Sequence, residues 1–171
     1  MAKHIWTIEK WMSNPAINNA NRRNGLRLRI EKEVDPRLKS GCLEFAKWLR
    51  KEYFFPSRVH IYIKARKRIR AMDGEYVCGT IFLPENYNFE PYIKVATGDF
   101  LELCEKRGVS NAINQILLCI AHELTHYYQW INSLNLTIIG EERQATRYSY
   151  YVLDEYRTGG TRDGSVSQSD R

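Results

Sequence analysis

Residues 120–126 read Ile-Ala-His-Glu-Leu-Thr-His, and they are the most informative segment of the sequence. They contain the pattern H-E-x-x-H within a stretch whose apolar residues recur every three or four positions, which predicts an α-helix from about Ser110 to Asn132. Side chains four positions apart lie on one face of a helix, one turn apart. His122 and His126 are therefore predicted to bind one Zn²⁺ ion, with Glu123 beside them as the catalytic base. The alternative is a buried amphipathic helix that carries two histidines by chance.

The third metal ligand is expected from the helix that follows, predicted over about residues 141–157. A catalytic zinc usually has three protein ligands. The longer pattern H-E-x-x-H-x-x-G-x-x-H is absent, and no histidine follows His126. The next helix opens with two candidates, Glu141 and Glu142. Glu142 is preferred because the residues on its face are small and would let the helices approach closely, and Glu141 is the alternative. A glutamate that is not a ligand would simply stabilise the helix N-terminus.

The composition is that of a folded protein of one domain. The chain has 171 residues, of which 43% are hydrophobic and 27% charged, and its formal net charge is +6. No apolar run is long enough to span a bilayer, and the N-terminus lacks the apolar stretch of a signal peptide. These features predict a cytoplasmic protein with no membrane partner. The modest basic excess is compatible with an anionic partner.

The four cysteines, at positions 42, 78, 104 and 119, are widely spaced and form no C-x-x-C pair. A zinc ribbon or a redox dithiol is therefore not expected. Two disulfides would suit a secreted chain, whereas a cytoplasmic chain favours buried, reduced thiols.

The remaining pattern predicts an α+β fold with a small, mostly antiparallel sheet, a backing helix, the H-E-x-x-H helix and a C-terminal helix that carries the ligand glutamate. The predicted helices span about residues 4–12, 36–53 and 99–107, and the predicted strands 26–30, 59–71, 76–83 and 92–97. The strands over 59–71 and 76–83 flank a Met-Asp-Gly turn and are predicted to form a long hairpin. Residues 1–36 are expected to form an N-terminal helix, linker and first strand, residues 37–157 the core, and residues 158–171 a disordered tail.

Basic side chains alternate along the predicted strand 59–71. Lys64, Arg66, Arg68 and Arg70 are expected on its polar face, together with His60 and Tyr62, and Arg27 and Arg29 on the polar face of the earlier strand. Such a surface could contact nucleic-acid phosphates or an acidic partner. The alternative is a solvated sheet face whose charges discourage aggregation.

Residues 120–126, the later segment Glu142-Arg-Gln-Ala-Thr146 and the strand over 79–84 together resemble a minimal gluzincin metallopeptidase of the SprT-like or ImmA/IrrE-like kind. The resemblance covers roughly residues 37–157. It implies a zincin-like fold, Zn²⁺ as cofactor, and a glutamate ligand on the last helix. Thr146 stands where this family often has Asp or Asn, and it is expected to orient a metal-bound histidine through its hydroxyl.

The expected function is that of a zinc-dependent endopeptidase that hydrolyses a protein or peptide substrate. The substrate would lie along the edge of the sheet, and a further donor would stabilise the oxyanion. The candidate donors are Tyr127, Tyr128, Tyr148, Tyr150 and Tyr151. The alternative is a nucleic-acid-binding or protein-binding module on a zincin scaffold with little proteolysis, and the presence of Glu123 favours the peptidase.

Overall fold

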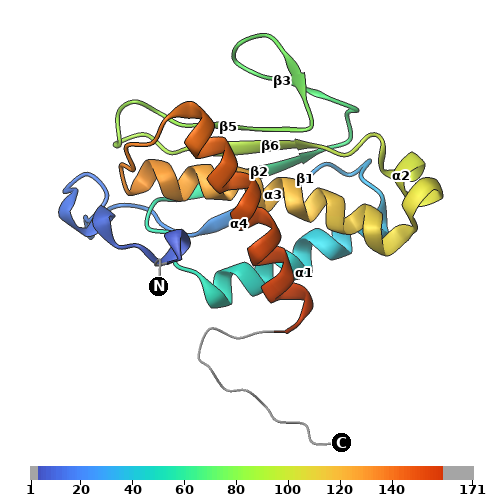
Figure 1. The fold of residues 1–171 in the computed structure, drawn as a ribbon, viewed down its shortest axis with the longest axis horizontal. Coiled ribbons are helices and arrows are strands. Elements are labelled where there is room, and N and C mark those ends of the chain that lie inside the picture. The colour runs from blue at the N-terminus through green and yellow to red at the C-terminus, as the bar shows by residue number, and fades with distance from the viewer. Residues whose placement is uncertain (1–3, 160–171) are drawn as a thin grey trace, which may run out of the picture.

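The computed structural model describes residues 4–159 as a mixed α+β fold (Figure 1). Two short 3₁₀-helices, η1 (Ile5–Thr7) and η2 (Lys10–Ser13), replace the predicted N-terminal α-helix. The other elements, in chain order, are β1 (Leu26–Ile30), α1 (Pro36–Glu52), β2 (Val59–Lys64), β3 (Ile69–Arg70), β4 (Tyr76–Val77), β5 (Gly79–Phe82), β6 (Tyr92–Ala96), α2 (Phe100–Arg107), α3 (Val109–Ile131) and α4 (Ile138–Arg157).

The main sheet has four strands in the order β1-β2-β6-β5. β1 pairs with β2 and β2 with β6 in parallel, and only β5 runs antiparallel to its neighbour β6. The prediction of a mostly antiparallel sheet is therefore wrong. For β1 and β2 the reason is that α1 connects them as a crossover helix, and strands joined in this way pair in parallel.

The predicted long hairpin is also wrong, because β2 ends at Lys64. Beyond it the Ala65 N–H donates to the Glu31 carboxylate (2.8 Å), and the Gly98 N–H donates to the carbonyl of Arg66 (2.7 Å). A Cβ at Gly98 would lie only 2.6 Å from the Arg66 backbone, so this approach requires glycine. Only the short strands β3 and β4 pair as a hairpin within this segment, and they form a separate two-stranded sheet.

The helices cover one face of the main sheet (Figure 1). α1 and α3 pack against its apolar face, and α4 lies across α3 on the side away from the sheet. The buried core includes alternate residues of the central strands, such as Ile61 and Ile63, and also Ile5 and Trp6 from the N-terminal segment. Residues 4–36 therefore share one core with the rest of the described chain.

Helix boundaries follow local capping chemistry. The Asp35 carboxylate accepts a hydrogen bond from the backbone N–H of Arg37 at the start of α1. α4 begins three residues earlier than predicted because the Thr137 hydroxyl accepts a hydrogen bond from the Gly140 N–H. Of the predicted C-terminal tail, only Thr158 and Gly159 are among the described residues.

The four cysteines are unpaired in the structure, but they are not uniformly buried. Cys42 is buried, Cys104 and Cys119 are half-buried, and Cys78 is exposed. The expectation of buried thiols is therefore wrong for Cys78. Among residues 4–159, no helix combines the length and apolar composition needed to cross a membrane.

The structure does not place Lys64, Arg66, Arg68 and Arg70 on one strand face. Lys64 ends β2 and forms an ion pair with Glu31 (3.2 Å), and Arg70 belongs to β3. Arg68 lies between the two strands and contacts Asp99 (3.5 Å). The predicted four-residue basic face therefore does not exist as such, because the chain leaves the main sheet after Lys64.

Candidate metal centre

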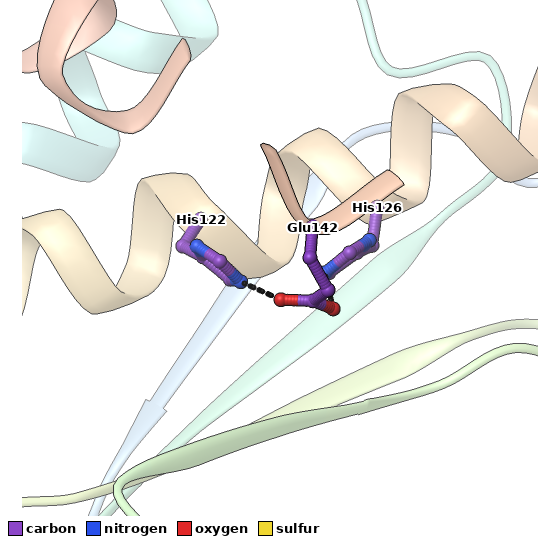
Figure 2. A group of neighbouring side chains, drawn as sticks. All are labelled: His122, His126 and Glu142. Atoms are coloured by element: carbon purple, nitrogen blue, oxygen red, sulfur yellow. Dashed lines mark ion pairs between the residues drawn. The ribbon is translucent and has the colours of Figure 1, made fainter. Parts of the chain in front are cut away.

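Two adjacent helices bring together His122, His126 and Glu142 (Figure 2). Both histidines lie on the face of α3 that meets α4, with their ring centroids 5.0 Å apart. Glu142 lies near the start of α4, which follows α3 after a short connection. It points between the two imidazoles (Figure 2). The structure thus groups the residues that the sequence identifies as candidate ligands.

The ligand atoms of this group are close enough for one metal ion. Glu142 Oε2 lies 3.2 Å from His122 Nε2, and Glu142 Oε1 lies 3.0 Å from His126 Nε2. One ligand atom from each residue lies within 4.8 Å of the other two. In a tetrahedral zinc site with bonds near 2.0–2.1 Å, neighbouring ligand atoms are about 3.3 Å apart. Two imidazoles and one carboxylate at these separations could hold a metal ion.

Glu142 and its neighbour Glu141 lie in different environments. The Glu142 carboxylate contacts both imidazoles, whereas Glu141 is absent from the cluster formed by the described residues. The backbone carbonyl of Glu141 accepts a hydrogen bond from Gln129 (3.0 Å). Adjacent residues on a helix are separated by about 100° of rotation, so only one of the two can face the histidines.

The imidazole of His126 is held by a residue that the sequence interpretation did not recognise. Nδ1 of His126 lies 2.8 Å from Oε1 of the buried side chain of Gln129. If Nδ1 donates this hydrogen bond, Nε2 is left with its lone pair toward Glu142, which is the tautomer that a metal ligand requires. Gln129 is itself fixed, because its Nε2 donates to the carbonyl of Glu141 and to Gln144 Oε1 (2.9 Å). Its position three residues after His126, on the same helix face, is the signal that could have identified it.

The orienting role predicted for Thr146 is not apparent in these contacts. Thr146 lines the hollow beside His122, and its carbonyl accepts a hydrogen bond from the Ser149 hydroxyl. No hydrogen bond from the Thr146 hydroxyl to either histidine is present among the described residues. His122 is half-buried, and burial together with the nearby His126 lowers its pKa, which favours the neutral imidazole that binds metals.

Glu123 is a buried carboxylate beside the cluster. It is 8% exposed, and none of the other described residues forms a hydrogen bond or an ion pair with its side chain. Burial raises its pKa to about 8, and the negative charge of Glu142 adds to the shift. A carboxyl group in this environment exchanges a proton near neutral pH, which is the property of a general acid or base.

The cluster lies between two surface hollows. On the His122 side lies a hollow of about 310 Å³. It is lined by Glu123 together with Cys78, Gly79, Leu118, Cys119 and Tyr150. On the His126 side a second hollow of about 220 Å³ is lined by Leu83, Tyr87, Trp130 and Leu134. Residues at both ends of β5 therefore contribute to the walls, and β5 is an edge strand of the main sheet.

Of the five tyrosines considered as oxyanion donors, only Tyr150 lines the hollow that contains Glu123. The Tyr127 hydroxyl is buried and donates to the carbonyl of Ser57 (2.6 Å), and the Tyr128 hydroxyl donates to the carbonyl of Phe54 (2.8 Å). Tyr148 and Tyr151 pack against the ring of His4. Tyr150 is 62% exposed and free to meet a bound molecule.

Comparisons of the chain with protein-family models, with curated proteins and with solved structures find no match. The functional assignment therefore rests on the geometry and chemistry of this site.

Proposed function

We propose that the protein is a zinc-dependent endopeptidase that hydrolyses a protein substrate. The observation that carries the proposal is the juxtaposition of His122, His126 and Glu142 with Glu123, a largely buried residue that lines the adjoining hollow and has no hydrogen-bond partner among the described residues. Two imidazoles and a carboxylate form the donor set of hydrolytic zinc sites that keep a fourth position open. A largely buried glutamate with a raised pKa, in a hollow beside a possible metal site, supports a catalytic role over a binding scaffold.

Zinc is the metal that we assign to this donor set, because imidazole nitrogen suits borderline ions better than calcium or magnesium, which prefer oxygen. His122, His126 and Glu142 would hold the ion, and Gln129 would fix the ring of His126. When bound, a zinc ion supplies Lewis acidity, which polarises a carbonyl and makes water more acidic.

Glu123 acts as the general base. Its carboxylate accepts a proton from the attacking water and then donates that proton to the nitrogen of the leaving amine. Burial in the hollow matters for both steps. A carboxylate with an ordinary pKa would be a weaker base toward water, and its protonated form would be too strong an acid to hold the proton until the amine leaves. The hydroxyl of Tyr150 is our candidate for the donor to the oxyanion.

The polypeptide substrate is proposed to lie extended along β5. β5 is at the end of the sheet, so one row of its backbone N–H and C=O groups has no neighbouring strand among the described residues. An extended segment that paired with this edge would pass the metal cluster, and its side chains could enter the hollows on either side. This arrangement, with a glutamate ligand on a second helix, is what we would expect of a minimal gluzincin of the SprT-like or ImmA/IrrE-like kind.

The test compares the wild type with Glu123→Gln in a cell lysate. Both zinc-loaded proteins are incubated with the lysate, and new peptide N-termini are identified by mass spectrometry. We expect N-termini that the wild type generates and Glu123→Gln does not, while both proteins keep their zinc. Glu141→Gln is the matched control and should cleave as the wild type does. Identical N-termini from the wild type and Glu123→Gln would remove the peptidase proposal and leave the binding-module alternative.

A further inference from the structure

The face of the main sheet opposite the helices carries a connected group of rings. It is formed by the outward side chains of β2, β5 and β6, namely His60, Tyr62, Tyr92 and Phe82. His60 and Tyr62 stack at 6.1 Å between centroids, and Tyr92 stacks on Phe82 at 5.1 Å. Tyr62 and Tyr92 join the two pairs with an edge contact at 6.2 Å. We name these four residues the ring platform.

The ring platform is half-buried by its neighbours on the sheet, but no described helix covers it (Figure 1). The strand register places the rings side by side across three strands: His60 lies beside Tyr92, and Tyr92 lies beside Phe82. Aromatic side chains are usually buried in a core, where they contribute most to stability. A row of rings that spans three strands on an uncovered face therefore indicates a contact surface.

Positive charges surround the ring platform. Arg27 lies beside His60 in the strand register, and Arg29 and Lys94 lie on either side of Tyr62. Among residues 4–159, no ion pair is formed by Arg27, Arg29 or Lys94, and Lys64 has one with Glu31. The ammonium groups of Lys64 and Lys94 lie 5.5 and 5.6 Å from the ring centroids of Tyr62 and Tyr92.

We propose that the ring platform and its flanking cations bind single-stranded nucleic acid. Every nucleobase has a flat face that can stack on an aromatic side chain, and every nucleotide carries a phosphate that a lysine or arginine can neutralise. A four-stranded sheet with aromatic rings among basic residues matches that alternation of base and phosphate. A duplex is a poor fit, because its bases are already stacked on each other and a flat sheet enters neither groove.

The hairpin of β3 and β4 bounds one side of this surface. A hollow of about 270 Å³ lies between it and the sheet, with Arg70 and Met72 on the hairpin side and Phe82, Tyr92 and Lys94 on the sheet side. A base stacked on the ring platform next to this hollow would have a cation within reach on each side. The binding surface thus includes two of the four predicted basic residues, Lys64 beside Tyr62 and Arg70 on the hairpin.

The test measures the fluorescence anisotropy of short labelled oligo(dT) and oligo(U) at several salt concentrations. The double variant Tyr62→Leu/Tyr92→Leu keeps apolar bulk but removes two rings, and we expect it to raise Kd by about tenfold or more with little change in the salt dependence. Phe54→Leu, which removes an exposed ring away from the sheet face, should leave Kd unchanged.

The charge variant is Arg27→Gln/Arg29→Gln/Lys94→Gln. It should weaken binding at low salt and reduce the slope of log Kd against log salt by about 2, since each neutralised phosphate on a single strand contributes about 0.7. The matched control, Lys47→Gln/Lys51→Gln/Arg147→Gln, removes three exposed cations from α1 and α4 and should keep the wild-type slope. Thermal unfolding and zinc uptake verify that each variant is folded.

Three results would overturn the proposal. The first is that the wild type binds neither oligonucleotide at low salt. The second is that the ring variant binds as the wild type does, which would show a surface that recognises charge alone. The third is that duplex DNA or poly-glutamate binds more tightly than the single strands do. Tighter binding of poly-glutamate would assign the face to an acidic protein instead.

Discussion

Glu123 illustrates how one residue's surroundings decide its chemistry. It neighbours a metal-ligand candidate in the sequence, yet it faces the hollow and has no described partner. In a metal-free protein, burial of its charged form opposes folding, and this penalty is what raises its pKa from 4.5 to about 8. The same raised pKa suits the carboxyl group to proton transfer. Replacing Glu123 is therefore expected to increase the stability of the metal-free protein and to remove the activity.

The pH dependence of stability tests this account of Glu123. Because the folded-state pKa is raised, the folded protein holds a proton that the unfolded chain releases between about pH 4.5 and pH 8. The contribution of Glu123 is therefore fully present below that window and is lost as the pH rises through it, with a total of a few kcal/mol. Urea unfolding of the metal-free proteins measures it: the free energy of unfolding of the wild type should fall relative to Glu123→Gln over this window. Parallel curves would contradict the assigned environment.

Gln129 is predicted to control the metal affinity without touching the metal. Gln129→Met keeps the volume of the side chain but removes the hydrogen bond to His126 Nδ1, so the ring loses its fixed orientation. We expect zinc affinity to fall by about 10-fold to 100-fold, measured by competition with a chromophoric chelator. Gln144→Met is the control, since Gln144 bonds to Gln129 but not to the histidine, and its effect should be much smaller. Equal effects would show that general packing is responsible.

At the scale of elements, the approach of β5 to α3 forms one wall of the site. Gly79 allows it, because a Cβ at this position would lie 2.4 Å from Cys119 Sγ and 3.6 Å from Glu123 Cγ. Gly79→Ala should therefore destabilise the protein by about 1–3 kcal/mol, the usual cost of overpacking, and lower the activity. Cys119→Ala in the same chain should recover part of that stability, measured by a double-mutant cycle in urea. Additive effects in the cycle would mean that the two elements are not in contact there.

The elements were predictable from the sequence to the extent that their signals are local. The alternation over residues 26–30 and the Asp-Pro start of α1 predict β1 and α1 at nearly their observed bounds. The partners of the strands depend on distant residues. β2 ends because the backbone groups of residues 64–66 form hydrogen bonds with Glu31, Thr97 and Gly98. All three of these residues are distant from residues 64–66 in the sequence. The strand–helix–strand order over residues 26–64 was the available signal for parallel pairing.

The candidate site was predictable for a similar reason. The spacing within one helix fixes the relative directions of His122 and His126, and small residues on α4 favour Glu142 over Glu141 as the residue that faces α3. The same helical spacing could have predicted the hydrogen bond between Gln129 and His126. The two hollows, the position of Tyr150 and the joining of His60 and Tyr62 to Tyr92 and Phe82 depend on how separate elements pack, which no local pattern reports.

At the scale of the whole molecule, the layers separate the two proposed activities. The candidate metal centre lies where α3 meets α4, on the helical side of the sheet, and the ring platform lies on the opposite face. Variants of one surface are therefore expected to leave the other intact. A metal ion held by α3 and α4 would also join two elements that otherwise contact through side chains, so that its binding free energy would add to the stability of the fold.

Zinc binding by the purified protein is the most direct test of the central claim, that His122, His126 and Glu142 form a metal centre. Metal-free protein is titrated with Zn²⁺ against a chromophoric chelator. The wild type should bind about one ion per chain, Glu142→Ala should bind it about a hundredfold more weakly, and Glu141→Ala should match the wild type. A wild type that takes up no zinc, or a greater loss in Glu141→Ala than in Glu142→Ala, would contradict the account.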